Sequence, residues 1–141
     1  MKKTIIIAVM LFSMVSFAQE SISERVEVLI PALIQVESGG DWKAIGDKGK
    51  AYGGLQLWKI YIKDVNRIAR TNYTHNDAFD EEKAKEIVRI YLINYGKRYE
   101  RLTGKTATYE VLSRIHNGGP NGWKKESTIK YWNKVKDKIN L

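Results

Sequence analysis

The sequence predicts a mainly α-helical domain, and three observations lead to that prediction. Apolar residues recur mainly three or four positions apart, which is the spacing of one face of a helix. The segment 39–56 holds six glycines, too many for a helix interior, so we expect a long shaped loop or a small hairpin there. The chain has no cysteine, so packing alone must hold the fold, and disulfide frameworks, zinc–cysteine sites and thiol nucleophiles are excluded.

The first 18 residues have the pattern of a secretory signal peptide. Two lysines precede an apolar run from Thr4 to Phe17, and small residues lead to Ala18, after which we expect cleavage. A transmembrane helix needs about 20 apolar residues, so this run is short for a retained membrane anchor, which is the alternative. The mature chain, 19–141, has a length that favours one domain with one core. We expect it in the periplasm or outside the cell, without stable insertion in the membrane.

The chain is basic. Its formal charge is +8, and removal of Lys2 and Lys3 with the signal peptide lowers this charge to +6. Such an excess suits an anionic polymer, which outside the membrane can be cell wall, wall-attached acidic glycan, lipid head groups or nucleic acid. A nucleic-acid or membrane binder stays as an alternative, although the lysines are dispersed and no docking motif is visible. We expect no nucleic-acid partner, because export removes most of them.

The first helix is predicted over residues 21–37. Its apolar residues form a one-sided stripe of Val26, Leu29, Ile30, Leu33, Ile34 and Val36. Only Pro31 interrupts this stripe, and we expect it to kink the helix or to start a second one. Gly39 and Gly40 are expected to end the helix. Long glycine-rich loops such as the one that follows usually carry function.

Two more helices are predicted after the glycine-rich segment. One covers residues 58–70, and the next starts near Asp80, where acidic residues lie at the positive end of the helix dipole. The inward stripe of the second of these helices is Ala84, Ile87, Val88, Tyr91, Leu92 and Tyr95.

The C-terminal part is predicted to hold two short helices. Thr106 or Thr108 is expected to cap the first, which stops at Gly118-Gly119-Pro120. Ser127 is expected to cap the second, whose lysines form a solvated face. The residues expected to face inward on this last helix are Ile129, Trp132, Val135 and Ile139.

Glu37 is the residue with the most unusual position. It lies four residues after Leu33 and seven after Ile30, so helical geometry puts its carboxyl on the apolar side of its own helix. It also occupies the last turn, where the negative end of the helix dipole disfavours a second negative charge. Both effects favour the protonated carboxyl, which is the form that can protonate a glycosidic oxygen. The alternative is a glutamate that turns to solvent at a frayed helix end.

Three segments resemble the signature of a known family. Residues 32–40 read Ala-Leu-Ile-Gln-Val-Glu-Ser-Gly-Gly, residues 53–57 read Gly-Gly-Leu-Gln-Leu, and residues 115–119 read Ile-His-Asn-Gly-Gly. Together, and in this order, they resemble the lytic transglycosylase (SLT domain) family of the lysozyme-like superfamily, over about residues 30–132. The resemblance implies a mainly helical, lysozyme-like fold of two lobes with a central cleft, and it aligns Glu37 with the catalytic acid of the family.

The same resemblance assigns roles to four further residues. Gln56 would line the cleft beside the sugar, Asn117 would close its far side, and Ser38 would steady the glutamate. Turn chemistry is the alternative role for Gln56 and Asn117, and the two roles are compatible. His116 stands where relatives carry a tyrosine that is hydrogen-bonded to the catalytic acid. Histidine could replace that bond, and its protonation would stabilise the ionised glutamate; an ordinary packing role is the alternative.

Aromatic side chains are the usual platforms for sugar rings. Tyr91 and Tyr95 share the buried stripe of their helix, whereas Tyr52 lies in the glycine-rich segment, so we expect Tyr52 to face the substrate. Trp42, Trp58 and Trp123 also lie near the signature segments, and we expect most of these aromatic residues to be core.

The resemblance implies cleavage of peptidoglycan glycan strands without water. Glu37 would protonate the oxygen between N-acetylmuramic acid and N-acetylglucosamine, and the acetamido group of the muramic acid would assist at the anomeric carbon. The resulting glutamate would deprotonate the 6-hydroxyl of the same sugar, which gives a 1,6-anhydro end. This route needs no metal or cofactor, and we expect the chain to act as a monomer on its glycan partner.

Two alternatives keep the same cleft. In a goose-type muramidase, Asp41 or Asp47 would position a hydrolytic water, although aspartate in such loops often caps a turn. In a catalytically silent wall-binding module, the cleft would bind glycan without cleaving it. A metal site is not expected, because His75 and His116 are the only histidines and no cysteine accompanies them.

Overall fold

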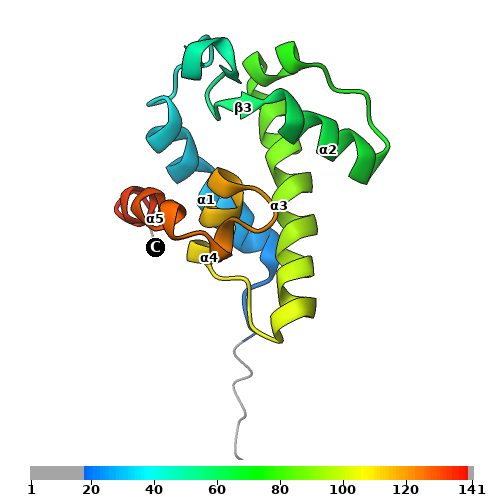
Figure 1. Ribbon diagram of the computed structural model, residues 1–141, viewed down its shortest axis with the longest axis vertical. Coiled ribbons are helices and arrows are strands. Elements are labelled where there is room, and N and C mark those ends of the chain that lie inside the picture. The colour runs from blue at the N-terminus through cyan, green and yellow to red at the C-terminus, as the bar shows by residue number, and fades with distance from the viewer. Residues whose placement is uncertain (1–17, 140–141) are drawn as a thin grey trace, which may run out of the picture.

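The computed structural model describes residues 18–139, so the predicted signal peptide, apart from Ala18, lies outside the described residues. The long helix α3 (Glu81–Thr103) runs the length of the molecule (Figure 1). The strands and α2 (Lys59–Ala69) lie beside its N-terminal half, whereas α1 (Ile22–Glu37), α4 (Tyr109–Gly118) and α5 (Ile129–Lys136) gather around the rest (Figure 1). This mainly helical arrangement confirms the predicted fold class. None of the helices within residues 18–139 is both long and apolar enough to cross a membrane.

Helix α1 delivers Glu37 to the middle of the molecule. Ser21 caps its first turn, because the Ser21 hydroxyl accepts from the Glu24 backbone and the Glu24 carboxylate accepts from the Ser21 backbone. Most of the predicted stripe is buried, with Val26, Leu29 and Leu33 fully enclosed, whereas Ile34 and Val36 are only partly buried. Pro31 lies on the exposed side of a continuous helix and does not start a second one.

The glycine-rich segment folds into a small antiparallel sheet in the order β1 (Ile45–Gly46), β2 (Ala51–Tyr52) and β3 (Leu57–Trp58). The hairpin alternative is therefore confirmed. The short 3₁₀ turn η1 (Asp47–Gly49) joins β1 to β2. Ala51 pairs with Trp58, and Tyr52 pairs with Leu57. Since successive residues of a strand point to opposite faces, Ala51 and Trp58 share one face and Tyr52 lies on the other.

Helix caps follow the sequence except at the last helix. Asp80 accepts from the Lys83 backbone at the start of α3, and Thr108, not Thr106, caps α4. The prediction that Ser127 caps the last helix is wrong, because the 3₁₀ turn η4 (Glu126–Thr128) precedes α5 and Thr128 takes the cap position.

The inward face of α5 also differs from the prediction at one position. Ile129 is 42% exposed, whereas Thr128 and Val135 are buried. The Thr128 hydroxyl donates within the preceding turn, to the carbonyl oxygens of Gly122 and Lys125. The turn thereby draws Thr128 inward, so Ile129 faces solvent.

Any side chain at Gly53 should destabilise the fold, for two reasons. Its φ is +76°, and a Cβ would come within 1.8 Å of the Ala78 carbonyl oxygen in η2 (His75–Phe79). Gly104 is a matched control, since its φ is +67° but nothing lies within 4 Å of the added Cβ. We expect Gly104→Ala to lower the free energy of unfolding by about 1 kcal/mol, and Gly53→Ala by about 1 to 3 kcal/mol more. Urea unfolding of both variants measures the difference, and equal losses would contradict the clash.

Candidate functional site

A cavity of about 1010 Å³ lies where the end of α1, the small sheet, α2, α3 and the end of α4 meet. The end of α1 contributes Glu37, the glycine-rich segment contributes Asp47 and Gln56, and the end of α4 contributes residues 116–119. The three segments of the sequence signature therefore meet at one cavity, although they lie far apart along the chain.

The Glu37 carboxyl lies in the wall of this cavity. Its side chain is 19% exposed, so it does not turn out to open solvent. The Tyr131 hydroxyl donates to Glu37 Oε1 at 2.7 Å, and His116 Nε2 lies 3.4 Å from the same oxygen. Within the described residues no hydrogen bond reaches Oε2. The carboxyl is thus held through one oxygen, and the other is available to a ligand in the cavity.

His116 is buried and linked to a second tyrosine. The Tyr61 hydroxyl lies 3.1 Å from His116 Nδ1. In this geometry Nδ1 can accept from the Tyr61 hydroxyl while Nε2 faces Glu37. Tyr61, His116 and Glu37 form one chain of polar contacts in the cavity wall.

Tyr131 is the residue of this candidate site that sequence reasoning missed. It contacts the acid from α5, 94 residues away along the chain. The family resemblance places a hydrogen-bonded tyrosine next to Asn117, where this chain has His116 instead. A tyrosine does hold the acid, but it comes from another helix. The only sequence signal that Tyr131 lies near the interior was its position next to Trp132, which was predicted to face inward.

Tyr61 and Tyr131 both remain protonated donors at neutral pH. Burial raises the pKa of Tyr131 far above its ordinary value, and the nearby negative Glu37 adds to this effect. Burial also raises the pKa of Tyr61, with smaller contributions from Tyr91 and Glu37.

These raised pKa values predict how alkaline pH affects stability. The ordinary pKa of tyrosine is 10.0. Above that pH the unfolded chain loses the Tyr131 proton while the folded chain keeps it, so the folded state loses roughly 1.4 kcal/mol of stability per pH unit for this group. We expect Tyr131→Phe to remove that part of the slope. Unfolding measured between about pH 10 and pH 11.5 tests this, and an unchanged slope would contradict it.

Stacked tyrosines extend the cavity wall away from Glu37. Tyr61 stacks on Tyr91 with ring centroids 3.7 Å apart, and Tyr95 meets Tyr91 edge-on at 4.7 Å. Tyr91 and Tyr95 are buried as the sequence predicted, and both also line the cavity. At the far end the Tyr95 hydroxyl donates to Asp64, which pairs with Arg67.

Gln56 and Asn117 both line the cavity. Gln56 also has the turn role weighed as its alternative, because its backbone φ is 50° and its amide donates to the Gly53 carbonyl at 2.9 Å. Asn117 is exposed at the end of α4, next to the glycines that end the helix.

The structure does not bring Ser38 or Tyr52 to the cavity. The Ser38 hydroxyl donates to the Gly54 carbonyl at 2.9 Å and accepts from the Asp41 backbone, so it ties the end of α1 to the glycine-rich segment. Tyr52 stacks on His75 with centroids 3.6 Å apart, on the face of the sheet opposite Ala51 and Trp58. Trp58, which is 41% exposed, is the aromatic residue that this sheet presents to the cavity.

The two candidate second carboxylates, Asp41 and Asp47, differ in their position relative to the cavity. Asp47 lines the cavity, whereas Asp41 does not and instead accepts from the Lys43 backbone at 2.9 Å, as a turn cap. Asp47 and Lys48 have φ values of 48° and 54°, and two successive non-glycine residues in this region indicate local strain. Among residues 18–139 no group of three or more acidic or histidine side chains could hold a metal ion.

The known proteins to which this chain is similar in sequence include several lysozymes. The chain is 33% identical over 131 residues to a lysozyme of Magallana gigas, which covers 90% of this chain and 88% of that protein. It is 38% identical over 85 residues to a lysozyme of Ostrea edulis, a match that spans only 58% of the relative. Invertebrate-type lysozyme 6 of Caenorhabditis elegans is 46% identical over 46 residues, or 33% of its length.

A solved structure agrees with these relatives. The crystal structure of a Meretrix lusoria lysozyme in complex with PliI of Aeromonas hydrophila superposes with a TM-score of 0.63 at 31% identity, over 86% of this chain and 93% of the other. No protein-family model matches the chain.

Proposed function

Because this chain belongs to the invertebrate-type lysozyme family, we propose that it is an exported muramidase that cleaves peptidoglycan by hydrolysis. The bond cleaved is the β-1,4 linkage between N-acetylmuramic acid and N-acetylglucosamine. The relatives and structures reported above are lysozymes, so they favour the hydrolytic alternative over the transglycosylase route that the sequence resemblance implied.

The observation that carries this proposal is the position of the Glu37 carboxyl. It lies in the wall of a cavity large enough for sugar rings, with Oε1 held by Tyr131 and Oε2 available. A protonated Oε2 can deliver its hydrogen to the glycosidic oxygen as the bond breaks. Because Tyr131 donates to Oε1, the ionised carboxylate that remains after proton transfer is also stabilised.

Asp47 is the second carboxylate in this proposal. Glycoside hydrolases use the second group either as a nucleophile on the sugar or as a base that activates water. Asp47 lines the same cavity as Glu37, and its strained backbone is held by the small sheet on either side. Trp58 offers an exposed ring on which a sugar can stack, and Asn117 offers an amide for its acetamido or hydroxyl groups.

Product analysis separates hydrolysis from the transglycosylase route. Purified peptidoglycan digested by the mature chain should yield fragments with a free reducing end, which borohydride reduces. A transglycosylase would leave 1,6-anhydro ends, lighter by one water and resistant to borohydride. Anhydro products would overturn the hydrolytic proposal, and an absence of any glycan cleavage would favour a silent wall-binding module.

A further inference from the structure

We infer that Lys63 and Arg67 on α2 form a subsite for a carboxylate of the peptide stems that substitute the glycan. This inference rests on the proposed function, because it names the part of peptidoglycan that the far end of the same cavity recognises. Neither residue is required for protonating or attacking the glycosidic bond.

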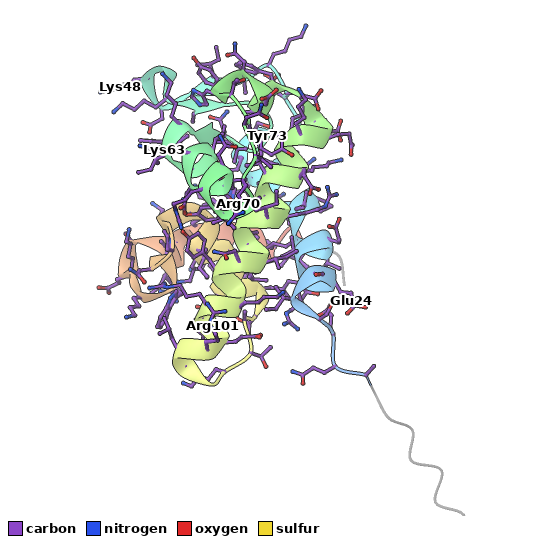
Figure 2. The ribbon with its side chains drawn as sticks, turned by 90° about the vertical axis from the view of Figure 1, so that its right-hand side faces the viewer. Glu24, Lys48, Lys63, Arg70, Tyr73 and Arg101 are labelled. Carbon is purple, nitrogen blue, oxygen red and sulfur yellow. The ribbon has the colours of Figure 1, made fainter. Side chains whose placement is uncertain are left out.

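A polar stripe of α2 faces the cavity. The lining residues of this helix are Ile60, Tyr61, Lys63, Asp64 and Arg67, which share one side of the helix. Figure 2 shows Lys63 on this helix and Arg70 at its C-terminal end, and Arg70 does not line the cavity.

The Arg67 guanidinium is oriented by its neighbours. Its Nε and Nη2 both donate to Asp64 Oδ1, at 3.1 Å and 2.6 Å, and Asp64 is held in turn by the Tyr95 hydroxyl. No described residue accepts from Arg67 Nη1, and the Arg67 side chain is 69% exposed. A ligand in the cavity can therefore reach a guanidinium whose direction is already set, which suits a planar carboxylate.

The charge balance at this end of the cavity favours an anion. Asp64 offsets Arg67, but Lys63 makes no ion pair with any residue in 18–139, so one positive charge remains. A neutral chain of acetylated sugars has no group that needs this charge. Peptide stems carry carboxylates beside the glycan. The Asp47 carboxylate, which also lines the cavity, would repel them, whereas Lys63 and Arg67 would attract them.

Binding to an inactive protein tests the subsite independently of turnover. In a Glu37→Gln background, calorimetry measures the dissociation constant for a muropeptide with free carboxylates and for the same muropeptide with its carboxylates converted to methylamides. We expect tighter binding of the acidic form. Lys63→Gln should weaken that form roughly three- to tenfold and leave the amidated form unchanged, and Lys63→Gln with Arg67→Gln should abolish the preference.

Lys59 and Arg70 provide the matched control. Lys59 begins α2 and Arg70 directly follows its last residue, and both are exposed cations outside the cavity lining. Lys59→Gln with Arg70→Gln therefore removes the same charge from the same part of the chain. The control pair should change both dissociation constants less than about twofold. If both double variants lose the same affinity, the effect is one of overall charge. If a variant loses the same affinity for both muropeptides, the defect is structural. Either result overturns the subsite.

The failure of the subsite can be told apart from the failure of the proposed function. If the wild-type chain cleaves no glycan but the Glu37→Gln protein prefers the acidic muropeptide through Lys63 and Arg67, the muramidase proposal falls and the subsite stands. If cleavage occurs and no such preference exists, the reverse holds.

Discussion

Glu37→Gln is expected to lower turnover of peptidoglycan about 1,000- to 10,000-fold while binding to the cell wall persists. General acid catalysis contributes about 100- to 10,000-fold, and the amide cannot supply the proton that the leaving sugar oxygen needs. Glutamine has nearly the same shape and can still accept from the Tyr131 hydroxyl at Oε1, so the cavity should keep its form. Release of soluble fragments from purified cell walls measures turnover, and pelleting with the same walls measures binding.

The fold of this variant has to be checked beside its activity. An unfolding transition within about 1 kcal/mol of the wild type would show that the loss belongs to chemistry and not to stability. Substantial turnover by Glu37→Gln would remove Glu37 from its assigned role, and with it the central claim about this cavity.

Asp47→Asn is expected to produce the second largest loss, about 100- to 1,000-fold in turnover. The uncharged amide can serve neither as nucleophile nor as base, whichever role Asp47 has. Asparagine is a suitable replacement, because like aspartate it tolerates the left-handed backbone that Asp47 adopts at φ 48°. Nuclear magnetic resonance of the wild-type product, recorded before mutarotation, then decides between the two roles: retained configuration indicates a nucleophile and inverted configuration indicates a base.

Asp41→Asn is the matched control for this experiment. Asp41 lies in the same glycine-rich segment but outside the cavity, where its carboxylate caps a turn through the Lys43 backbone. Asparagine can keep that hydrogen bond, so turnover should change little. Loss of turnover in Asp41→Asn alone would reverse the assignment of the second carboxylate, and full activity of both variants would favour a mechanism with one carboxylate.

Much of the fold could be read from residue spacing and local caps. The stripe of α1, the start of α3 at Asp80 and the end of α4 at the glycines were all predicted, because each depends on residues within a few positions of one another. The prediction failed at Ser127 and Ile129, where a 3₁₀ turn with a buried threonine shifts the register of α5. That turn is stabilised by a hydrogen bond to Gly122 in the preceding 3₁₀ turn η3 (Gly122–Lys124), which local spacing does not reveal.

The candidate site was likewise predictable from the sequence only in part. The sequence alone determined that Glu37 ends a helix on its apolar side, because helical periodicity is a local property. The family resemblance, and not any local pattern, indicated that two glycine-bounded segments belong with it. Only the tertiary structure decided that Tyr131 holds the acid, that Trp58 and not Tyr52 faces the cavity, and that Asp47 and not Asp41 reaches it. These outcomes depend on strand pairing and on helix packing across the whole chain, where contacts join residues whose separation in sequence carries no periodic signal.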